Sequence, residues 1–172
     1  MAFPTETFYG LGAAALNAHA VGRIFQVKRR PDAKPLLVLV DSIRMAESVA
    51  YVPEAARPLM IRHWPGPLTL VMKSRADLPA GLTAGTGTIG VRMSGHPVAS
   101  GLVHALGEPV TAPSANRSGS PPCVTADAVL AELGGDIDLL IDACPAAGGL
   151  PSTVLDLTVT PARVIRPGAV MP

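Results

Sequence analysis

The sequence has few aromatic residues, little net charge and almost no cysteine. Aromatic side chains make up only 3% of 172 residues, so Val, Leu, Ile and Ala must fill the core of a chain that is 48% hydrophobic. A formal net charge of +1 gives no whole-surface reason to expect nucleic-acid or membrane binding, so any basic site must be local. Length and apolar content predict one globular domain over residues 1–172.

The two cysteines, Cys123 and Cys144, are too few for a disulfide framework and have no metal-ligand spacing with the four histidines. No apolar run approaches the length of a membrane span, and the N-terminus lacks the order of a signal peptide. We therefore expect a cytoplasmic protein with reduced thiols and no membrane association.

Motifs of several common enzyme classes are also missing. The chain contains no Gly-Lys pair, which excludes a P-loop. The string GTGTIG at 85–90 has the spacing of a dinucleotide fingerprint, but it leads into a predicted strand instead of a helix, so we interpret it as accidental. No serine lies in a nucleophile-elbow pattern, which disfavours a Ser-His-Asp triad but leaves open one assembled from distant residues.

Helical and strand-like patterns alternate along the chain. Helices are predicted at 17–29 with Asn17 as the N-cap, at 42–63, at 96–107 with Gly107 as the stop, and at 125–135. Strands are predicted at 35–41, 68–73, 88–93, 108–113, 138–143, 152–158 and 162–168. This alternation predicts an α/β domain with a mixed sheet.

Polar clusters lie at the ends of several apolar segments. Residues 28–31 end a helix with three cations, which either offset the helix dipole or clamp an anion. Arg92 lies inside an apolar strand, and Arg166 lies near the end of another. Residues 111–122 form either an ordinary Pro/Ser/Gly turn or a polar pocket. Separate basic sites in a protein of low net charge indicate convergence on one acidic ligand.

Taken together, seven segments between residues 3 and 170 closely resemble the YrdC/TsaC-like threonylcarbamoyl-AMP synthase family. They are PTETFYGLG, KRRPDAKPLLVLV, WPGPLTLVM, TIGVRMSGHP, APSANRSG, STVLDL and VIRPGAV. The resemblance implies a YrdC-like twisted mixed sheet, flanked by helices, with a concave basic face. It also implies that L-threonine, bicarbonate and ATP give threonylcarbamoyl-adenylate and pyrophosphate. A threonylcarbamoyl transferase complex then modifies adenosine 37 of tRNA, with possible direct tRNA contact by this chain.

The resemblance also assigns site residues. The catalytic set is Lys28, Arg30, Ser114 and Asn116, and these four bind ATP together with Thr88 and Arg166. The threonine-binding residues are Thr5, Tyr9, Arg92, Ala112 and Ser152. Mg²⁺ is expected with ATP, its protein ligands are not identified, and no permanently bound cofactor is expected.

The chain departs from the family pattern in several places. It begins at Met1 without the helix and strand that usually precede the Pro-Thr-Glu-Thr motif, and Lys34, Leu39 and Pro151 replace a frequent Asn, His and Glu. Two other functions therefore remain open. One is a domain that adenylates carbamoyl phosphate, and the other is a non-catalytic module that binds RNA on its basic face.

Overall fold

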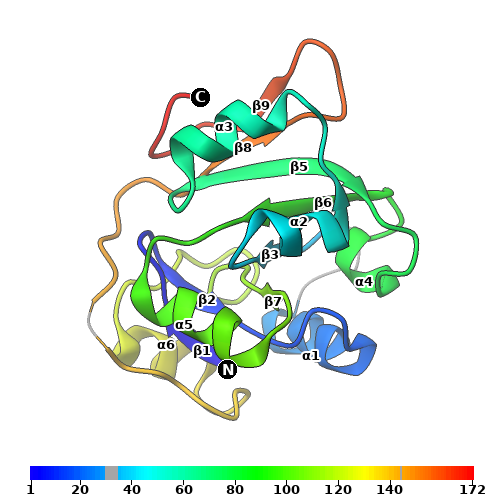
Figure 1. The fold of residues 1–172 in the computed structure, drawn as a ribbon. Helices are drawn as coiled ribbons and strands as arrows, with labels where there is room; N and C mark the ends of the chain where they lie inside the picture. The colour runs from blue at the N-terminus through cyan, green and yellow to red at the C-terminus, as the bar shows by residue number, and fades with distance from the viewer. Residues whose placement is uncertain (30–34, 144) are drawn as a thin grey trace.

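A computed structural model describes residues 1–29, 35–143 and 145–172 of the chain. Within these residues, seven strands form one mixed sheet in the order β7-β3-β6-β5-β8-β9, with β4 paired to β5, and β1 and β2 form a separate hairpin. Figure 1 shows the hairpin, α1, α5 and α6 beside the β7 end of the sheet, whereas β9 and the C-terminus lie at the other end. This arrangement confirms the expected mixed α/β fold.

The strands are short, and the longest, β5, has seven residues. The strands are β1 (Ala2–Pro4), β2 (Tyr9–Leu11), β3 (Leu37–Leu39), β4 (Ala50–Tyr51), β5 (Leu68–Ser74), β6 (Thr88–Arg92), β7 (Val110–Thr111), β8 (Thr153–Asp156) and β9 (Arg163–Arg166). The helices are α1 (Ala18–Lys28), α2 (Ile43–Val49), α3 (Ala56–His63), α4 (Ala80–Thr83), α5 (Pro97–Leu106) and α6 (Ala126–Leu133).

The predicted start of one helix and the predicted end of another are confirmed by their caps. The side chain of Asn17 accepts hydrogen bonds from two backbone N–H groups of the first turn of α1. Helix α5 ends at Gly107, whose φ of 70° is the left-handed conformation that glycine adopts without strain. The string GTGTIG leads into β6, as expected, and not into a helix.

One face of the sheet is packed into the apolar core. Strand β5 places Leu68, Leu70 and Met72 in this core, and β6 adds Ile89 and Val91. Helices α2 and α3 both contribute buried residues to this core, and Figure 1 shows α3 near β5 and β8 and α2 near β3 and β6. Because successive side chains of a strand point to opposite sides of a sheet, the residues between these must face the other way.

The opposite face of the sheet is partly polar. It carries Thr69 on β5, and Thr88, Gly90 and Arg92 on β6, at alternating positions with the core residues. Thr69 and Arg92 are almost fully buried, which is unusual for polar side chains and requires partners. This face forms the floor of the cavity described below.

The β1–β2 hairpin is tied to the segment that follows β7. The N–H of Leu11 donates to the carbonyl of Pro113 at 2.7 Å, and the N–H of Ala115 donates to the carbonyl of Tyr9 at 2.8 Å. Strand β7 itself pairs with β3 of the main sheet. The hairpin is therefore held beside the sheet by backbone hydrogen bonds and faces its polar side.

The predicted helix at 42–63 is wrong in its middle. The chain forms α2, then β4 pairs with Ser74 and Lys73 of β5, and α3 follows. Pro53 explains the break, because proline lacks a backbone N–H and disfavours helical geometry at the residue before it.

The predicted strand at 138–143 is also wrong. Within it, Leu140 makes an isolated bridge to Ala2, and the flanking Asp138 and Leu139 are exposed. The N–H of Ala2 donates to the carbonyl of Leu139 at 2.8 Å, and the N–H of Ile141 donates to the carbonyl of Ala2 at 2.9 Å, but the pairing does not extend into a ladder. The structure also contains β1, β2, β4 and α4, none of which the periodicity predicted.

Candidate functional site

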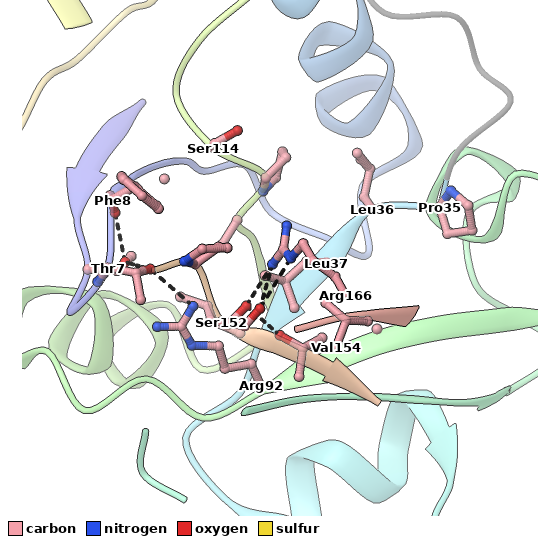
Figure 2. Close-up of a pocket in the computed structure, with 18 of the residues that line it drawn as sticks. Thr7, Phe8, Pro35, Leu36, Leu37, Arg92, Ser114, Ser152, Val154 and Arg166 are labelled. Carbon is pink, nitrogen blue, oxygen red and sulfur yellow. Dashed lines mark hydrogen bonds between the residues drawn. The ribbon is translucent and has the colours of Figure 1, made fainter. Parts of the chain in front are cut away.

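A cavity of about 400 Å³ opens over the polar face of the sheet. Its floor comes from β3, β5, β6 and β8, and its wall comes from the hairpin region and residues 112–114 (Figure 2). Most of the sequence-predicted site residues line it: Thr5, Tyr9, Thr88, Arg92, Ala112, Ser114, Ser152 and Arg166. Lys28 and Asn116 belong to the adjoining structure and not to the lining, whereas Arg30 lies outside the described residues.

Arg92 is a buried cation in the cavity lining. Its side chain is only 4% exposed, and its Nη2 lies 2.6 Å from the Oε1 of Glu6. Its Nε donates to the carbonyl of Gly66 at 3.3 Å, and its Nη1 donates to the Oγ1 of Thr7 at 3.5 Å. Since a guanidinium has five N–H donors, it retains capacity for a ligand carboxylate. Figure 2 shows Arg92 beside Thr7.

Glu6 connects Arg92 to the turn that follows β6. Its Oε1 also accepts the N–H of Gly95 at 3.2 Å, and its Oε2 accepts a hydrogen bond from the hydroxyl of Ser94. Burial alone would raise the pKa of Glu6, but the charge of Arg92 and these hydrogen bonds outweigh burial and hold the pKa below its ordinary value. Glu6 is therefore ionised at neutral pH.

Arg166 is the second cation of the cavity lining. Its Nη2 donates to the carbonyl and hydroxyl oxygens of Ser152 at 2.9 and 3.0 Å. The Ser152 hydroxyl lies 3.0 Å from the hydroxyl of Thr69 on β5 (Figure 2 shows the Arg166–Ser152 contacts). Burial, together with the nearby charge of Arg92, lowers the pKa of Arg166. Among the residues that the structure describes, no carboxylate pairs with Arg166, so its charge is available to an anion.

The Ser114–Ser120 loop is held from below by the end of α1. The Nζ of Lys28, a residue only 3% exposed, donates to the backbone carbonyl of Asn116 at 2.7 Å and to that of Ser114. The N–H of Ser118 donates back to the carbonyl of Lys28 at 2.9 Å. The ammonium of Lys28 thus supports the loop main chain, a role that the cation run at 28–31 did not reveal.

Asn116 has its amide orientation set by two carbonyl groups. Its Nδ2 donates to the carbonyl of Arg117 at 2.8 Å and to that of Ser120 at 2.6 Å. Both partners only accept, so the amide nitrogen must face them. The Oδ1 is buried and has no partner among the described residues. This oxygen suits a ligand hydroxyl, an amino group or a water, and not a phosphate oxygen.

The wall of the cavity is built from small, well-bonded groups. The hydroxyl of Thr5 donates to the carbonyl of Phe8 at 2.7 Å and closes the turn before β2. Tyr9 is fully buried, and the N–H of Ala112 donates to the carbonyl of Leu37 at 2.9 Å. Burial and hydrogen bonds thus hold these wall residues in place.

Thr88 lies at the edge of the cavity, with its Oγ1 2.8 Å from the Oγ1 of Thr86. The unusual residues Leu39 and Pro151 both line the cavity, so these departures fall where a ligand would bind. Lys34 lies outside the described residues.

Sequence reasoning assigned no role to Glu6, Thr7 or Thr69. Thr7 and Thr69 line the cavity, and Glu6 lies directly behind Arg92. Thr69 carries a usable signal, because it is the one polar residue among the first five residues of β5 and lies at a period-two position that opposes the core. Glu6 carried none, since its partner is distant in sequence.

The cavity as a whole suits an acidic or zwitterionic organic ligand. Two guanidinium groups lie in it, and none of its described lining residues is acidic. Across residues 1–29, 35–143 and 145–172, no cluster of His, Cys, Asp or Glu could hold a metal ion. In the same ranges, no helix is both long and apolar enough to cross a membrane.

Comparison with known proteins identifies the class. The Sua5/YciO/YrdC family model, described as "Telomere recombination", matches residues 1–168. The chain therefore belongs to the Sua5/YciO/YrdC family. This confirms the resemblance that the seven segments indicated.

Individual relatives agree with this membership. The chain is 44% identical over 169 residues to a threonylcarbamoyl-AMP synthase of Pyrococcus abyssi, covering 98% of this chain and 50% of that protein. A Bacillus subtilis protein of the same name is 42% identical over 172 residues, with 99% and 50% covered. The crystal structure of P. abyssi Sua5 with L-threonine superposes with a TM-score of 0.94 at 45% identity, covering 97% of this chain and 49% of that one. The chain thus spans about half the length of these relatives.

Proposed function

We propose that this protein is an L-threonylcarbamoyl-adenylate synthase, which forms threonylcarbamoyl-AMP and pyrophosphate from L-threonine, bicarbonate and ATP. The observation that carries the proposal is the cavity itself, which Arg92 and Arg166 line together over one polar sheet face. Relatives that carry the name threonylcarbamoyl-AMP synthase, and the L-threonine bound to P. abyssi Sua5, support the same activity.

The proposed reaction is an adenylyl transfer, so the enzyme would be a nucleotidyltransferase. The amino nitrogen of threonine first forms a bond to the carbon of bicarbonate, a C–O bond of bicarbonate breaks, and water leaves, which gives the carbamate. A carbamate oxygen then forms a bond to the α-phosphorus of ATP, while the bond from that phosphorus to the bridging oxygen breaks and pyrophosphate leaves with the electron pair. Such a displacement requires alignment of the reactants and neutralisation of phosphate charge. It needs no protein nucleophile.

The site residues take the following roles in this proposal. Arg92 pairs with the threonine carboxylate, with Thr5, Tyr9, Ala112 and Ser152 around it. Arg166 and Thr88 contact ATP, together with Ser114, Asn116 and Arg30. Lys28 acts in ATP binding by supporting the Ser114–Asn116 main chain.

Magnesium enters this proposal as the complex with ATP. The described cavity lining offers no carboxylate for it, so phosphate oxygens and water would supply most of its ligands. The adenylate product is unstable in water, so we propose that a threonylcarbamoyl transferase complex consumes it and modifies adenosine 37 of tRNA.

Pyrophosphate release tests the proposal. Purified protein is incubated with MgATP and bicarbonate, with and without L-threonine, and with carbamoyl phosphate in a parallel reaction. Threonine-dependent release, with the adenylate detected by mass spectrometry, is the expected result. Release only with carbamoyl phosphate would move the protein to carbamoyl adenylation. Salt-sensitive RNA binding without any release would instead identify a binding module.

A further inference from the structure

The two arginines of the cavity lie in different electrostatic environments. Arg92 forms a buried ion pair of 2.6 Å with Glu6, whereas Arg166 is bonded to the uncharged oxygens of Ser152. Within the described chain, no acidic side chain is paired with Arg166. One cation of the cavity is therefore neutralised by a carboxylate and the other is not. The immediate surroundings of the two guanidinium groups are called the Arg92 end and the Arg166 end below.

Glu6 is built into the fold as a counter-charge to Arg92. One carboxylate oxygen pairs with Arg92 and also accepts the N–H of Gly95, and the other oxygen accepts the hydroxyl of Ser94. Its side chain is 21% exposed and does not line the cavity. Glu6 thus acts on a ligand through Arg92 and not by direct contact.

This arrangement has a consequence for ligand choice. A neutralised ion pair in a poorly solvated site attracts a simple anion weakly, because the negative charge of Glu6 repels the anion and offsets its attraction to Arg92. A zwitterion brings its own positive charge, so its ammonium experiences the negative potential of Glu6 while its carboxylate bonds to Arg92. The uncompensated Arg166 end favours a polyanion such as a phosphate chain.

We propose that Glu6 is a positioning residue that sets the ligand selectivity of the Arg92 end, making it prefer a zwitterionic amino acid to the corresponding simple anion. The inference rests on the proposed function, because that function places L-threonine at this end. It adds a selectivity mechanism and a residue that the proposed function does not require.

The test compares L-threonine with 3-hydroxybutyrate, which is threonine without its ammonium group. Calorimetric titrations measure both affinities for the wild type, Glu6→Gln and Glu6→Asp. Glu47→Gln is the matched control, because Glu47 pairs with Arg57 at 3.0 Å on the surface, where both side chains are well exposed. Thermal unfolding of each variant verifies that it is folded.

We expect the wild type, Glu6→Asp and Glu47→Gln to bind threonine with at least tenfold higher affinity than 3-hydroxybutyrate. In Glu6→Gln the preference should fall at least tenfold, because 3-hydroxybutyrate binds more tightly and threonine does not. If Glu6 had only a structural role, Glu6→Gln would weaken the binding of both ligands equally. The ratio of the two affinities would then stay unchanged, and this result would overturn the inference.

If Glu6→Gln does not fold, the wild-type affinities can still overturn the inference. Equal wild-type affinities for the two ligands would overturn the role of Glu6 while leaving the proposed function intact. No wild-type binding of threonine, combined with no threonine-dependent pyrophosphate release, would overturn the proposed function and the inference with it.

Discussion

The ammonium group of Lys28, at the end of α1, donates a hydrogen bond of 2.7 Å to the main-chain carbonyl of Asn116, 88 residues further along the chain. A second bond reaches the carbonyl of Ser114, whose residue lines the cavity. The end of a helix and a distant loop are therefore one structural unit, and the chemistry of the loop depends on a buried cation beneath it.

Replacing Lys28 by methionine should destabilise the protein and weaken ATP binding together. Lys28→Met leaves two carbonyls without their donor, and an unsatisfied buried polar group costs about 1–3 kcal/mol. Urea unfolding and ATP titration measure the two effects. Lys73→Met, at an exposed lysine on β5, is the control and should change stability by less than about 0.5 kcal/mol. Equal effects of the two variants would contradict the supporting role of Lys28.

Substitutions of the two cavity arginines should weaken the binding of different substrates. Arg92→Ala should reduce L-threonine affinity at least about tenfold and leave ATP affinity nearly unchanged, because a charged hydrogen bond contributes about 1.5–3 kcal/mol. Arg166→Ala should produce the reverse pattern. Titration of each variant with each substrate gives the comparison. If both variants lost the same substrate, the assignment of the two ends would be wrong.

Acid should lower the folding stability of the wild-type protein more than that of Glu6→Gln. Burial tends to raise the Glu6 pKa, but the charge of Arg92 and the hydrogen bonds from Arg92 and Ser94 bring it below the ordinary value of a glutamate. A lowered folded-state pKa means that the unfolded chain binds the proton first as the pH falls. The stabilisation is thus complete above the unfolded pKa and is lost as the pH falls through the lowered folded value.

Urea unfolding at several pH values between about 6 and 3 measures this difference. The stability advantage of the wild type over Glu6→Gln should shrink steadily across the acid part of this range. Parallel curves for the two proteins would mean that the Glu6 pKa is not lowered by folding.

Two glycines should respond oppositely to alanine. At Gly12 an added Cβ would lie 2.5 Å from Cε1 of the buried Phe3 and 3.1 Å from Cγ1 of Val110, so Gly12→Ala should destabilise the protein by about 1–3 kcal/mol. At Gly22, in α1, a Cβ meets nothing within 4 Å, and Gly22→Ala should stabilise by about 0.5–1 kcal/mol. Thermal unfolding of both variants checks the signs, and a stable Gly12→Ala would show that the Phe3 contact is not tight.

Much of the fold followed from local patterns. The cap at Asn17, the stop at Gly107 and the apolar strand at β5 are local signals, because each depends on residues within a few positions. Pro53 marks the helix break in the sequence itself, although the predicted helix at 42–63 runs across it. The isolated contact of Leu140 could not be predicted, since an apolar run has the same appearance whether or not a neighbouring strand extends the ladder.

The sequence by itself determined the family and most of the residues around the cavity, because motif identity and strand alternation are properties of short segments. Only the tertiary structure decided how the charges are distributed among them. Glu6 neutralises Arg92 across 86 positions, Lys28 is directed to loop carbonyls, and Arg166 keeps its charge beside Ser152. These differences arise because an ion pair or a buried hydrogen bond depends on distances of a few ångströms, which packing sets and local sequence does not.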